Sequence, residues 1–324
     1  MQYIDLHCDT LMRAFSLQQQ DIFSMEKTMV DIRRLQEAHC MAQFFAIFMP
    51  SPTAVARMGD RYPGDDAYIH ALHGILTESI RLNPSRIASA ENADDICANH
   101  AAGKASALLT LEDGRTVEGS MANLERFYGM GIRLISLTWN QANCFGAPNS
   151  DDPAVMNTGL TDFGKDAVVR MQELGMLVDV SHLSDGGFWD VAKLSHKPFV
   201  ASHSNCRAIA PHRRNLTDEM IRALADRGGV AGLNFCPQFL TADVTCSVER
   251  AEDIARNARH MANTGGIGCV ALGTDFDGID GQLEVGTPTD LPILYRELAK
   301  VGFSEDDLEK ITHKNAMRVI RDTL

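Results

Sequence analysis

The chain has 324 residues, of which 45% are hydrophobic and 23% are charged, so it can bury a large core and has no disordered composition. Its formal net charge of −13 argues against nucleic acid or an anionic membrane surface as a partner. No segment reaches the roughly 18 apolar residues of a membrane span. The first residues, from Met1 to His7, lack the pattern of a secretory signal.

Apolar runs that recur along the chain, separated by amphipathic stretches, predict strands that alternate with helices. Continuous apolar strands are typical of a parallel sheet that helices cover. About eight repeats favour a (β/α)8, TIM-like barrel, although the periodicity leaves an open doubly wound sheet as an alternative. No linker divides the chain, so we expect residues 1–324 to form a single catalytic domain. The predicted strands are Tyr3–Cys8, Ala42–Phe48, Ser106–Leu111, Arg133–Thr138, Met176–Val180, Phe199–Ser202, Val230–Asn234 and Cys269–Gly273.

Two helices stand out between and after these strands. One has its apolar face at Tyr68, Leu72, Ile75, Leu76 and Ile80. The other begins at Ser304, with Asp307 as its capping-box partner, and carries Leu308, Ile311, Val319 and Ile320. The loop-rich intervals Pro50–Asp66 and Ala142–Gly164 are expected to form walls of a site.

Polar residues follow five of the predicted strands at their carboxyl ends. His7 and Asp9 are two apart, so their side chains point to the same side of the first strand. Glu112, His182, His203 and Asp275 come at the ends of the third, fifth, sixth and eighth strands. Each of them alone is commonly a structural residue or a helix cap. Together they predict a metal site, because these ends converge on one face of a barrel and imidazole and carboxylate suit zinc.

Five strings of residues, in this order and across nearly the whole chain, resemble the membrane (renal) dipeptidase family, as a bacterial-type soluble member. The His-x-Asp pair alone is weak, because many metal-dependent barrels carry something similar, but the five strings together are specific. They are Asp5-Leu6-His7-Cys8-Asp9-Thr10, Leu111-Glu112-Asp113-Gly114, Asp179-Val180-Ser181-His182, Ala201-Ser202-His203-Ser204 and Gly273-Thr274-Asp275-Phe276-Asp277-Gly278.

The resemblance implies a zinc-dependent dipeptidase with two Zn²⁺ ions per chain. His7 and Asp9 would bind one ion, Glu112 would bridge both, and His182 and His203 would bind the second. A hydroxide bridging the ions would attack the peptide carbonyl, and Asp275 would act as the acid/base. The string Pro211-His212-Arg213-Arg214-Asn215 matches a family motif whose second arginine holds the C-terminal carboxylate of the substrate. That role falls to Arg214, with Arg213 nearer the surface.

One segment departs from the family pattern. Where better-known members have a histidine that contacts the substrate carbonyl, this chain reads Leu137-Thr138-Trp139-Asn140. An indole can donate a hydrogen bond but cannot accept one. We therefore expect Trp139 to be a packing wall of the substrate pocket, and Asn140 or Asn143 to be a substitute donor.

The resemblance also implies a small peptide substrate, with a D-residue tolerated at the C-terminal position, and a homodimer. Eight cysteines without a Cys-x-x-Cys pair indicate buried thiols in a reducing compartment, so we expect a cytoplasmic protein. The sequence shows neither a secretory signal nor a hydrophobic C-terminal tail, so we do not expect the lipid anchor of mammalian relatives. Two alternatives stay open. One is another metal-dependent barrel hydrolase, although those typically use His-x-His after the first strand. The other is a catalytically inactive binding relative.

Overall fold

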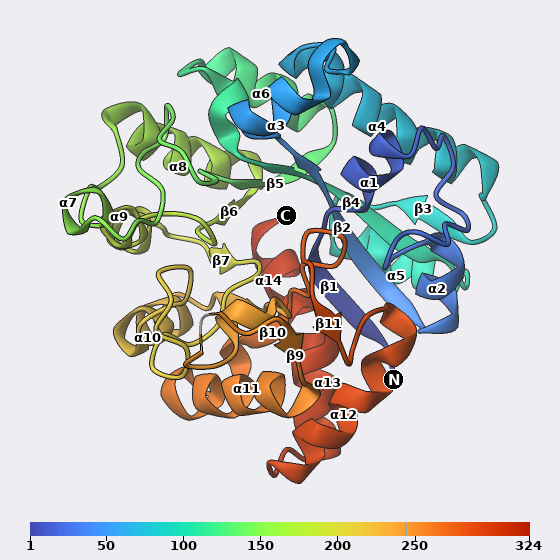
Figure 1. Cartoon of the computed structure of the whole chain (residues 1–324), viewed down its shortest axis with the longest axis vertical. Helices are drawn as coiled ribbons and strands as arrows, with labels where there is room; N and C mark the ends of the chain where they lie inside the picture. The colour runs from blue at the N-terminus through green and yellow to red at the C-terminus, as the bar shows by residue number, and fades with distance from the viewer. Residues whose placement is uncertain (244) are drawn as a thin grey trace.

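A closed ring of parallel strands forms the centre of the computed structural model, which describes residues 1–243 and 245–324 (Figure 1). The strands follow one another in the order β2-β1-β10-β8-β7-β6-β5-β4, and β4 pairs again with β2, which closes the barrel. The prediction of a (β/α)8 barrel is therefore confirmed. The strands are β1 (Tyr3–Cys8), β2 (Cys40–Phe48), β4 (Ala105–Glu112), β5 (Ile132–Ser136), β6 (Leu177–Asp179), β7 (Val200–Ala201), β8 (Val230–Leu233) and β10 (Val270–Leu272).

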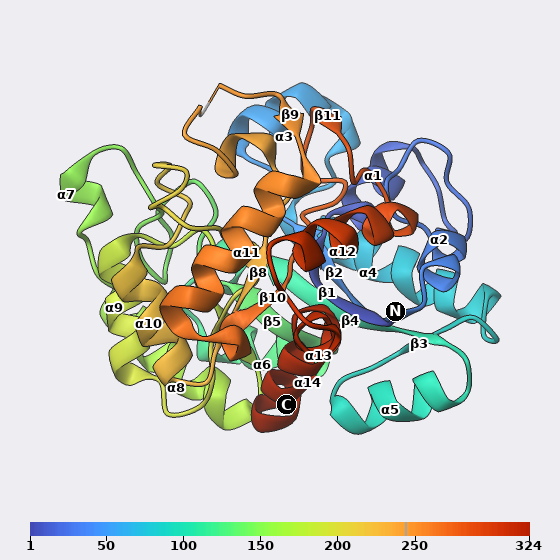
Figure 2. The ribbon, with the colours of Figure 1, turned by 90° about the horizontal axis from the view of Figure 1, so that it is seen from below.

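Helices surround the barrel, and α11 and α12 pack side by side on its outside (Figure 2). The apolar face predicted from Tyr68 to Ile80 lies on α4, where Tyr68, Leu72, Ile75 and Leu76 are buried. The helices are α1 (Thr10–Ser16), α2 (Ile32–Glu37), α3 (Pro52–Met58), α4 (Asp65–Leu82), α5 (Ala93–Ala101), α6 (Met121–Gly129), α7 (Pro153–Met156), α8 (Asp162–Leu174), α9 (Asp185–Leu194), α10 (Asp218–Asp226), α11 (Ala251–Gly265), α12 (Leu291–Lys300), α13 (Glu305–Glu309) and α14 (Asn315–Thr323).

Three short strands were not predicted. Strand β3 (Ile87–Ser89) pairs with the first residues of β4. Strand β5 pairs with the later residues of β4 on the same edge. Strands β9 (Val248–Glu249) and β11 (Gln282–Leu283) form a separate parallel pair. Runs of two or three residues are too short to show a periodicity in the sequence.

The predicted C-terminal helix is interrupted. Ser304 and Asp307 form the expected capping box at the start of α13, but residues Lys310–Lys314 form a π-helical turn before α14 begins. Helix α14 then packs against the amino-terminal end of the barrel, where the Asn315 side chain donates to the carbonyls of Ile267 and Val270. That end of the barrel is closed, which leaves the carboxyl ends of the strands for a site.

The core has two layers. One fills the barrel, where alternate strand residues such as Leu6, Phe44 and Leu108 meet Ile320 of α14. The other lies between the strands and the surrounding helices, with Phe45 and Leu109 among its members. The inward positions change from apolar to polar toward the carboxyl ends of the strands, as on β4, where Leu108 is followed by Thr110 and Glu112.

Several strands end earlier than predicted. The run Met176–Val180 narrows to β6 because the Asp179 carboxylate accepts hydrogen bonds from the backbone N–H and the hydroxyl of Ser181, which turns the chain. The eighth predicted strand stops at Leu272, and Asp275 takes a left-handed conformation with φ of 62°. These early ends turn the chain toward the barrel mouth.

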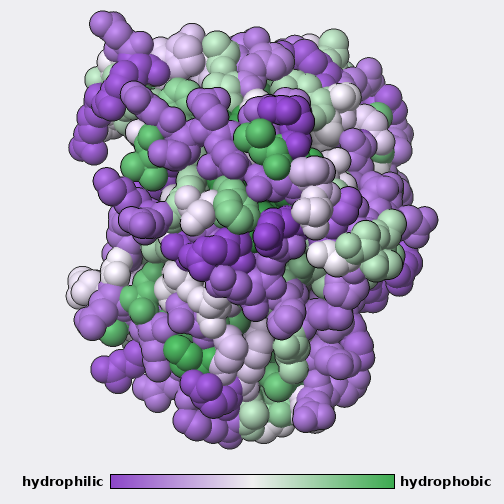
Figure 3. Space-filling model, turned by 90° about the vertical axis from the view of Figure 1, so that its right-hand side faces the viewer, coloured by the Kyte–Doolittle hydropathy of each residue, from purple (hydrophilic) through white to green (hydrophobic). Residues whose placement is uncertain are grey.

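The surface seen in Figure 3 is mostly hydrophilic, with hydrophobic residues scattered in small patches. Among the described residues, no helix has the length and the apolar character needed to cross a bilayer. Five of the eight cysteines are buried, as expected for thiols in a core. Cys97 is exposed, and Cys144 and Cys246 are only half-buried, so the expectation fails for these three.

Candidate metal centre and active site

The polar residues predicted from the strand ends meet at one point of the barrel mouth. His7 Nε2 lies 3.5 Å from Asp9 Oδ2 and 3.3 Å from Glu112 Oε2. His182 Nε2 and His203 Nε2 are 3.0 Å apart. Ligand atoms of His7, Glu112 and His203 lie within 4.8 Å of one another, and so do those of His7, Asp9 and Asp275. Two neighbouring groups of side chains that could hold a metal ion therefore share His7.

Glu112 lies between His7 and the pair of His182 and His203. Its Oε2 faces His7, whereas its Oε1 lies 3.0 Å from His182 Nε2 and 3.7 Å from His203 Nε2. Glu112 is 3% exposed and is the last residue of β4. A carboxylate whose two oxygens face different sets of donors has the arrangement needed to bridge two cations.

Several buried polar atoms at this point have no hydrogen-bond partner among the described residues: Nδ1 and Nε2 of His7, Oδ1 of Asp9 and Oε2 of Glu112. Buried polar groups nearly always have a hydrogen-bond partner, so a cluster of such atoms without partners indicates a binding site for a ligand. Burial, together with the nearby Asp9 charge, raises the pKa of Glu112 to about 7 and that of Asp275 to about 6. A bound cation would relieve this repulsion and displace the protons. The residues therefore fit a metal ion.

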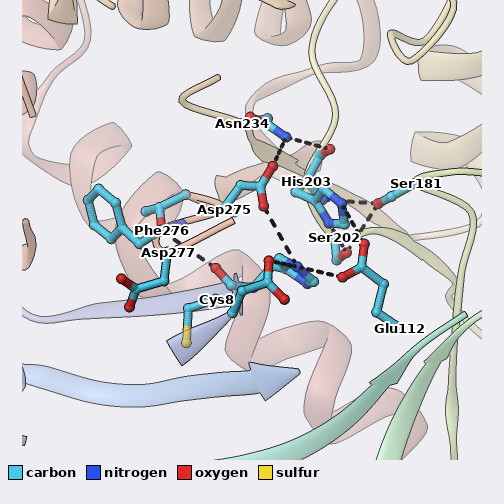
Figure 4. Close-up of polar contacts among 12 residues, drawn as sticks. Cys8, Glu112, Ser181, Ser202, His203, Asn234, Asp275, Phe276 and Asp277 are labelled. Atoms are coloured by element: carbon cyan, nitrogen blue, oxygen red, sulfur yellow. Dashed lines mark hydrogen bonds and ion pairs between the residues drawn. The ribbon is translucent and has the colours of Figure 1, made fainter. Parts of the chain in front are cut away.

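The two histidines after β6 and β7 are held as neutral rings. Burial, together with the positive charges of Arg214 and His7, lowers the pKa of both His182 and His203. The Ser202 hydroxyl donates to Asp179 Oδ2 at 2.6 Å, so it accepts from Nδ1 of His203 at 2.7 Å. The proton of the His203 ring is then on Nδ1, and its Nε2 lone pair faces the centre of the site (Figure 4).

Asp275 faces the site from the segment after β10, the strand next to β1 in the ring. Asn234 donates to its Oδ2 at 2.9 Å, while its Oδ1 points toward His7, 3.8 Å from Nε2 (Figure 4). Its close approach to Asp9 depends on Gly278. A Cβ atom at Gly278 would lie 2.1 Å from Asp9 Oδ2 and 2.5 Å from Asp275 Oδ1, so only glycine leaves room for both carboxylates.

A cavity of about 470 Å³ opens above these residues. Both arginines of the predicted motif line it, but only Arg214 is buried, at 6% exposed. Its guanidinium contacts neutral acceptors: Nε2 of His182 at 3.1 Å, the carbonyl of His203 and the hydroxyl of Ser204. None of the ion pairs formed by the described residues includes it, whereas Arg213 pairs with Asp151 at 2.5 Å near the surface. Arg214 is thus a buried cation available to an anionic ligand.

Trp139 and Asn140 line the same cavity, at the position where the chain departs from the family pattern. The Asn140 Oδ1 lies 3.4 Å from His182 Nδ1. Asn143, in contrast, uses its side chain to bond Asp113, the Leu137 carbonyl and the Phe145 N–H. Of the two loop intervals expected as walls, the second contributes Asn149 to the cavity. No described residue of Pro50–Asp66 lines it, and Pro52–Met58 of that interval form α3.

The family model described as membrane dipeptidase, peptidase family M19, matches residues 1–324 of the chain. The chain belongs to this family. This membership confirms the resemblance drawn from the five strings, and it makes the chain a metallo-dipeptidase, a hydrolase of peptide bonds. It also rules out the alternative of a barrel hydrolase from a different family.

Known membrane dipeptidase relatives match most of the chain. A solved structure described as a dipeptidase and M19 metallopeptidase superposes with a TM-score of 0.90 at 27% identity, covering 100% of this chain and 98% of the other. A metallopeptidase from Rhodobacter sphaeroides, liganded with a phosphinate mimic of L-Ala-D-Ala, gives 0.89 at 27% identity, covering 100% and 99%. The dipeptidase aclJ of Aspergillus oryzae is 28% identical over 90% of this chain and 69% of its own length.

The sequence analysis did not predict the buried polar residues whose hydrogen bonds hold the side chains of this membrane dipeptidase site in position. Asp5 accepts from the backbone N–H and hydroxyl of Thr274 at 2.8 Å each, which ties β1 to the segment after β10. Asp179 accepts from the Ser202 hydroxyl, which in turn contacts the His203 ring, and Asn234 donates to Asp275. The sequence does give a signal for Asp5 and Asp179, since each is a single acidic residue in an apolar strand. A carboxylate buried there needs hydrogen-bond donors, which indicates a supporting role.

Proposed function

We propose that the chain hydrolyses dipeptides with a free C-terminal carboxylate, using two zinc ions. The observation that carries this proposal is the position of Glu112, whose two oxygens face His7 on one side and His182 and His203 on the other. His7 and Asp9 would hold one ion, His182 and His203 the second, and Glu112 both. Imidazole nitrogen and carboxylate oxygen are ligands that zinc prefers. Bound there, the ions would polarise the scissile carbonyl and lower the pKa of a water toward about 7.

Asp275 would move the proton in this reaction. Its Oδ1 faces the centre, so this atom would take a proton from the attacking water and pass it to the leaving amine. Asn234 would keep the carboxylate in place by its bond to Oδ2. Asp275 also lies close enough to His7 and Asp9 to be a ligand, and the metal content of a variant separates the two roles.

Arg214 would hold the C-terminal carboxylate of the substrate by a planar, bidentate pair. Replacement of Arg214 with Met should lower kcat/KM for L-Ala-L-Ala by about ten- to a hundredfold, the range expected when hydrogen bonds to a charged group are lost. Steady-state kinetics with L-Ala-L-Ala and its C-terminal amide check this. The variant should no longer distinguish the two substrates. A larger loss in the matched Arg213→Met variant would assign the role to Arg213 instead.

Asn140 would donate a hydrogen bond to the substrate carbonyl in place of the family histidine. Replacement of Asn140 with Ala should then lower kcat by about a hundredfold, the lower end of the loss caused by removing one oxyanion donor. Turnover measured on zinc-loaded enzyme checks this, and an unchanged kcat would remove Asn140 from the mechanism. The Asn143→Ala variant is the comparison. It should lower the melting temperature, because it breaks three loop hydrogen bonds.

The substrate class is best tested with a panel of L-L and L-D dipeptides, since a relative binds a mimic of L-Ala-D-Ala. Zinc-loaded chain should hydrolyse dipeptides, including some with a D-residue at the C-terminal position. Failure to hydrolyse any of them, with both ions bound, would favour the inactive binding relative. Three further predictions stay untested: that residues 1–324 form a single catalytic domain, that the protein is a homodimer, and that it is cytoplasmic.

A further inference from the structure

The mouth of the barrel carries different chemistry on its opposite sides. Around the closed ring, β2 and β7 are four steps apart, so they lie across the barrel from each other. Phe48 is the last residue of β2, and Trp139 follows β5, with Glu112 of β4 between them. Arg214 lies on the side of β6 and β7, where its guanidinium contacts Nε2 of His182 and the His203 carbonyl. The cavity therefore has a cationic end and an apolar end.

The apolar end of the cavity is formed by packed aromatic and aliphatic side chains. The rings of Phe48 and Trp139 meet edge to face, with centroids 5.0 Å apart and planes at 79°. Met12, Phe48 and Trp139 all line the cavity and are only half-buried, so their apolar faces are open to a ligand. We call these three side chains the apolar wall. Trp139 also lies near the metal-site residues, with its ring centroid 6.1 Å from that of His182.

We infer that the apolar wall binds the side chain of the N-terminal residue of the substrate and makes the enzyme selective for dipeptides with a bulky apolar residue there. This inference rests on the proposed function. With the carboxylate at Arg214 and the scissile carbonyl over Glu112, the C-terminal residue lies on the β7 side. The N-terminal residue then extends toward β2, where Phe48 and Trp139 remove its side chain from water. Trp139, where better-known members have a histidine, gives this chain that surface.

The test is the ratio of kcat/KM for Leu-Ala to that for Gly-Ala, measured on zinc-loaded enzyme. The ratio should be about tenfold or more in the natural chain, within the range that a hydrophobic pocket achieves. It should fall by about tenfold in Trp139→Ala. The chain has only one other tryptophan, Trp189, which is 44% exposed on α9. Trp189→Ala is the matched control and should leave the ratio unchanged.

Three results would overturn the inference: a ratio near one in the natural chain, an unchanged ratio in Trp139→Ala, or a preference that follows the C-terminal residue in Ala-Leu against Ala-Gly. Lack of hydrolysis of every dipeptide would instead count against the proposed function.

A binding measurement tests the wall without turnover. In Trp189→Phe, Trp139 is the sole tryptophan, so its fluorescence reports directly on the wall. A phosphinate dipeptide mimic with a leucine side chain at the N-terminal position should change this emission and bind about tenfold more tightly than the glycine mimic. Equal affinities, or emission that does not respond to the leucine mimic, would overturn the inference.

Discussion

Replacement of Asp275 with Asn should lower kcat by about two to four orders of magnitude, the contribution expected of a positioned general acid/base. Asparagine keeps the shape of the side chain and can still accept from Asn234 Nδ2. It also tolerates the left-handed φ of 62° at this position, so the fold should be preserved. The loss would then come from the missing proton carrier. Metal analysis of the same preparation should still give two zinc ions per chain.

The matched control is Asp277→Asn, two residues further on. Asp277 is buried, has a φ of 69°, and accepts from the Thr10 hydroxyl and the Met29 N–H at 2.7 Å each, outside the cavity lining. This variant should melt at a lower temperature yet retain kcat close to that of the natural chain. If Asp275→Asn keeps its turnover, Asp275 has no part in the proton transfer. If it loses an ion, Asp275 is a ligand.

Replacement of Glu112 with Gln should weaken the binding of both zinc ions, by more than about a hundredfold each. The estimate is a lower limit, because changes to groups that only support a ligand already cost about ten- to a hundredfold in metal affinity. The amide nitrogen would turn a donor toward either His7 or the His182–His203 pair, so the side chain could no longer serve both. Competition with a chelator, followed by elemental analysis, measures the affinity.

Two comparisons sharpen this result. His182→Ala should release one ion and leave the other, because its ring faces only one oxygen of Glu112. Asp113→Asn, at the next residue, should keep both ions, since the Asp113 carboxylate bonds Asn143 and Arg115 away from the centre. Loss of a single ion in Glu112→Gln would show that the carboxylate does not bridge.

The sequence was sufficient to predict the barrel and the residues that face its mouth. Parallel strands place their carboxyl ends together, so His7, Glu112, His182, His203 and Asp275 could be grouped without coordinates. The supporting contacts could not be found in this way. Asn234 and Asp275 are 41 residues apart, and only the pairing of β8 with β10 brings them within 2.9 Å.

The interruption of the C-terminal helix and the cavity walls also depend on tertiary structure. An apolar period that continues from Leu308 to Ile320 does not reveal the π-helical turn between α13 and α14. The sequence predicts Trp139 as a wall of the pocket but not its partner Phe48. Phe48 ends β2 and Trp139 follows β5, and nothing in the sequence indicates that these two strand ends lie close together. Only closure of the barrel places both rings at the same side of the cavity.

Zinc titration of the metal-free chain tests the central claim most directly. After removal of metal with a chelator, hydrolysis of Leu-Ala should be absent and should return as zinc is added, reaching its maximum at two equivalents per chain. Saturation at one equivalent, or hydrolysis that survives complete removal of metal, would contradict a centre in which Glu112 joins two ions.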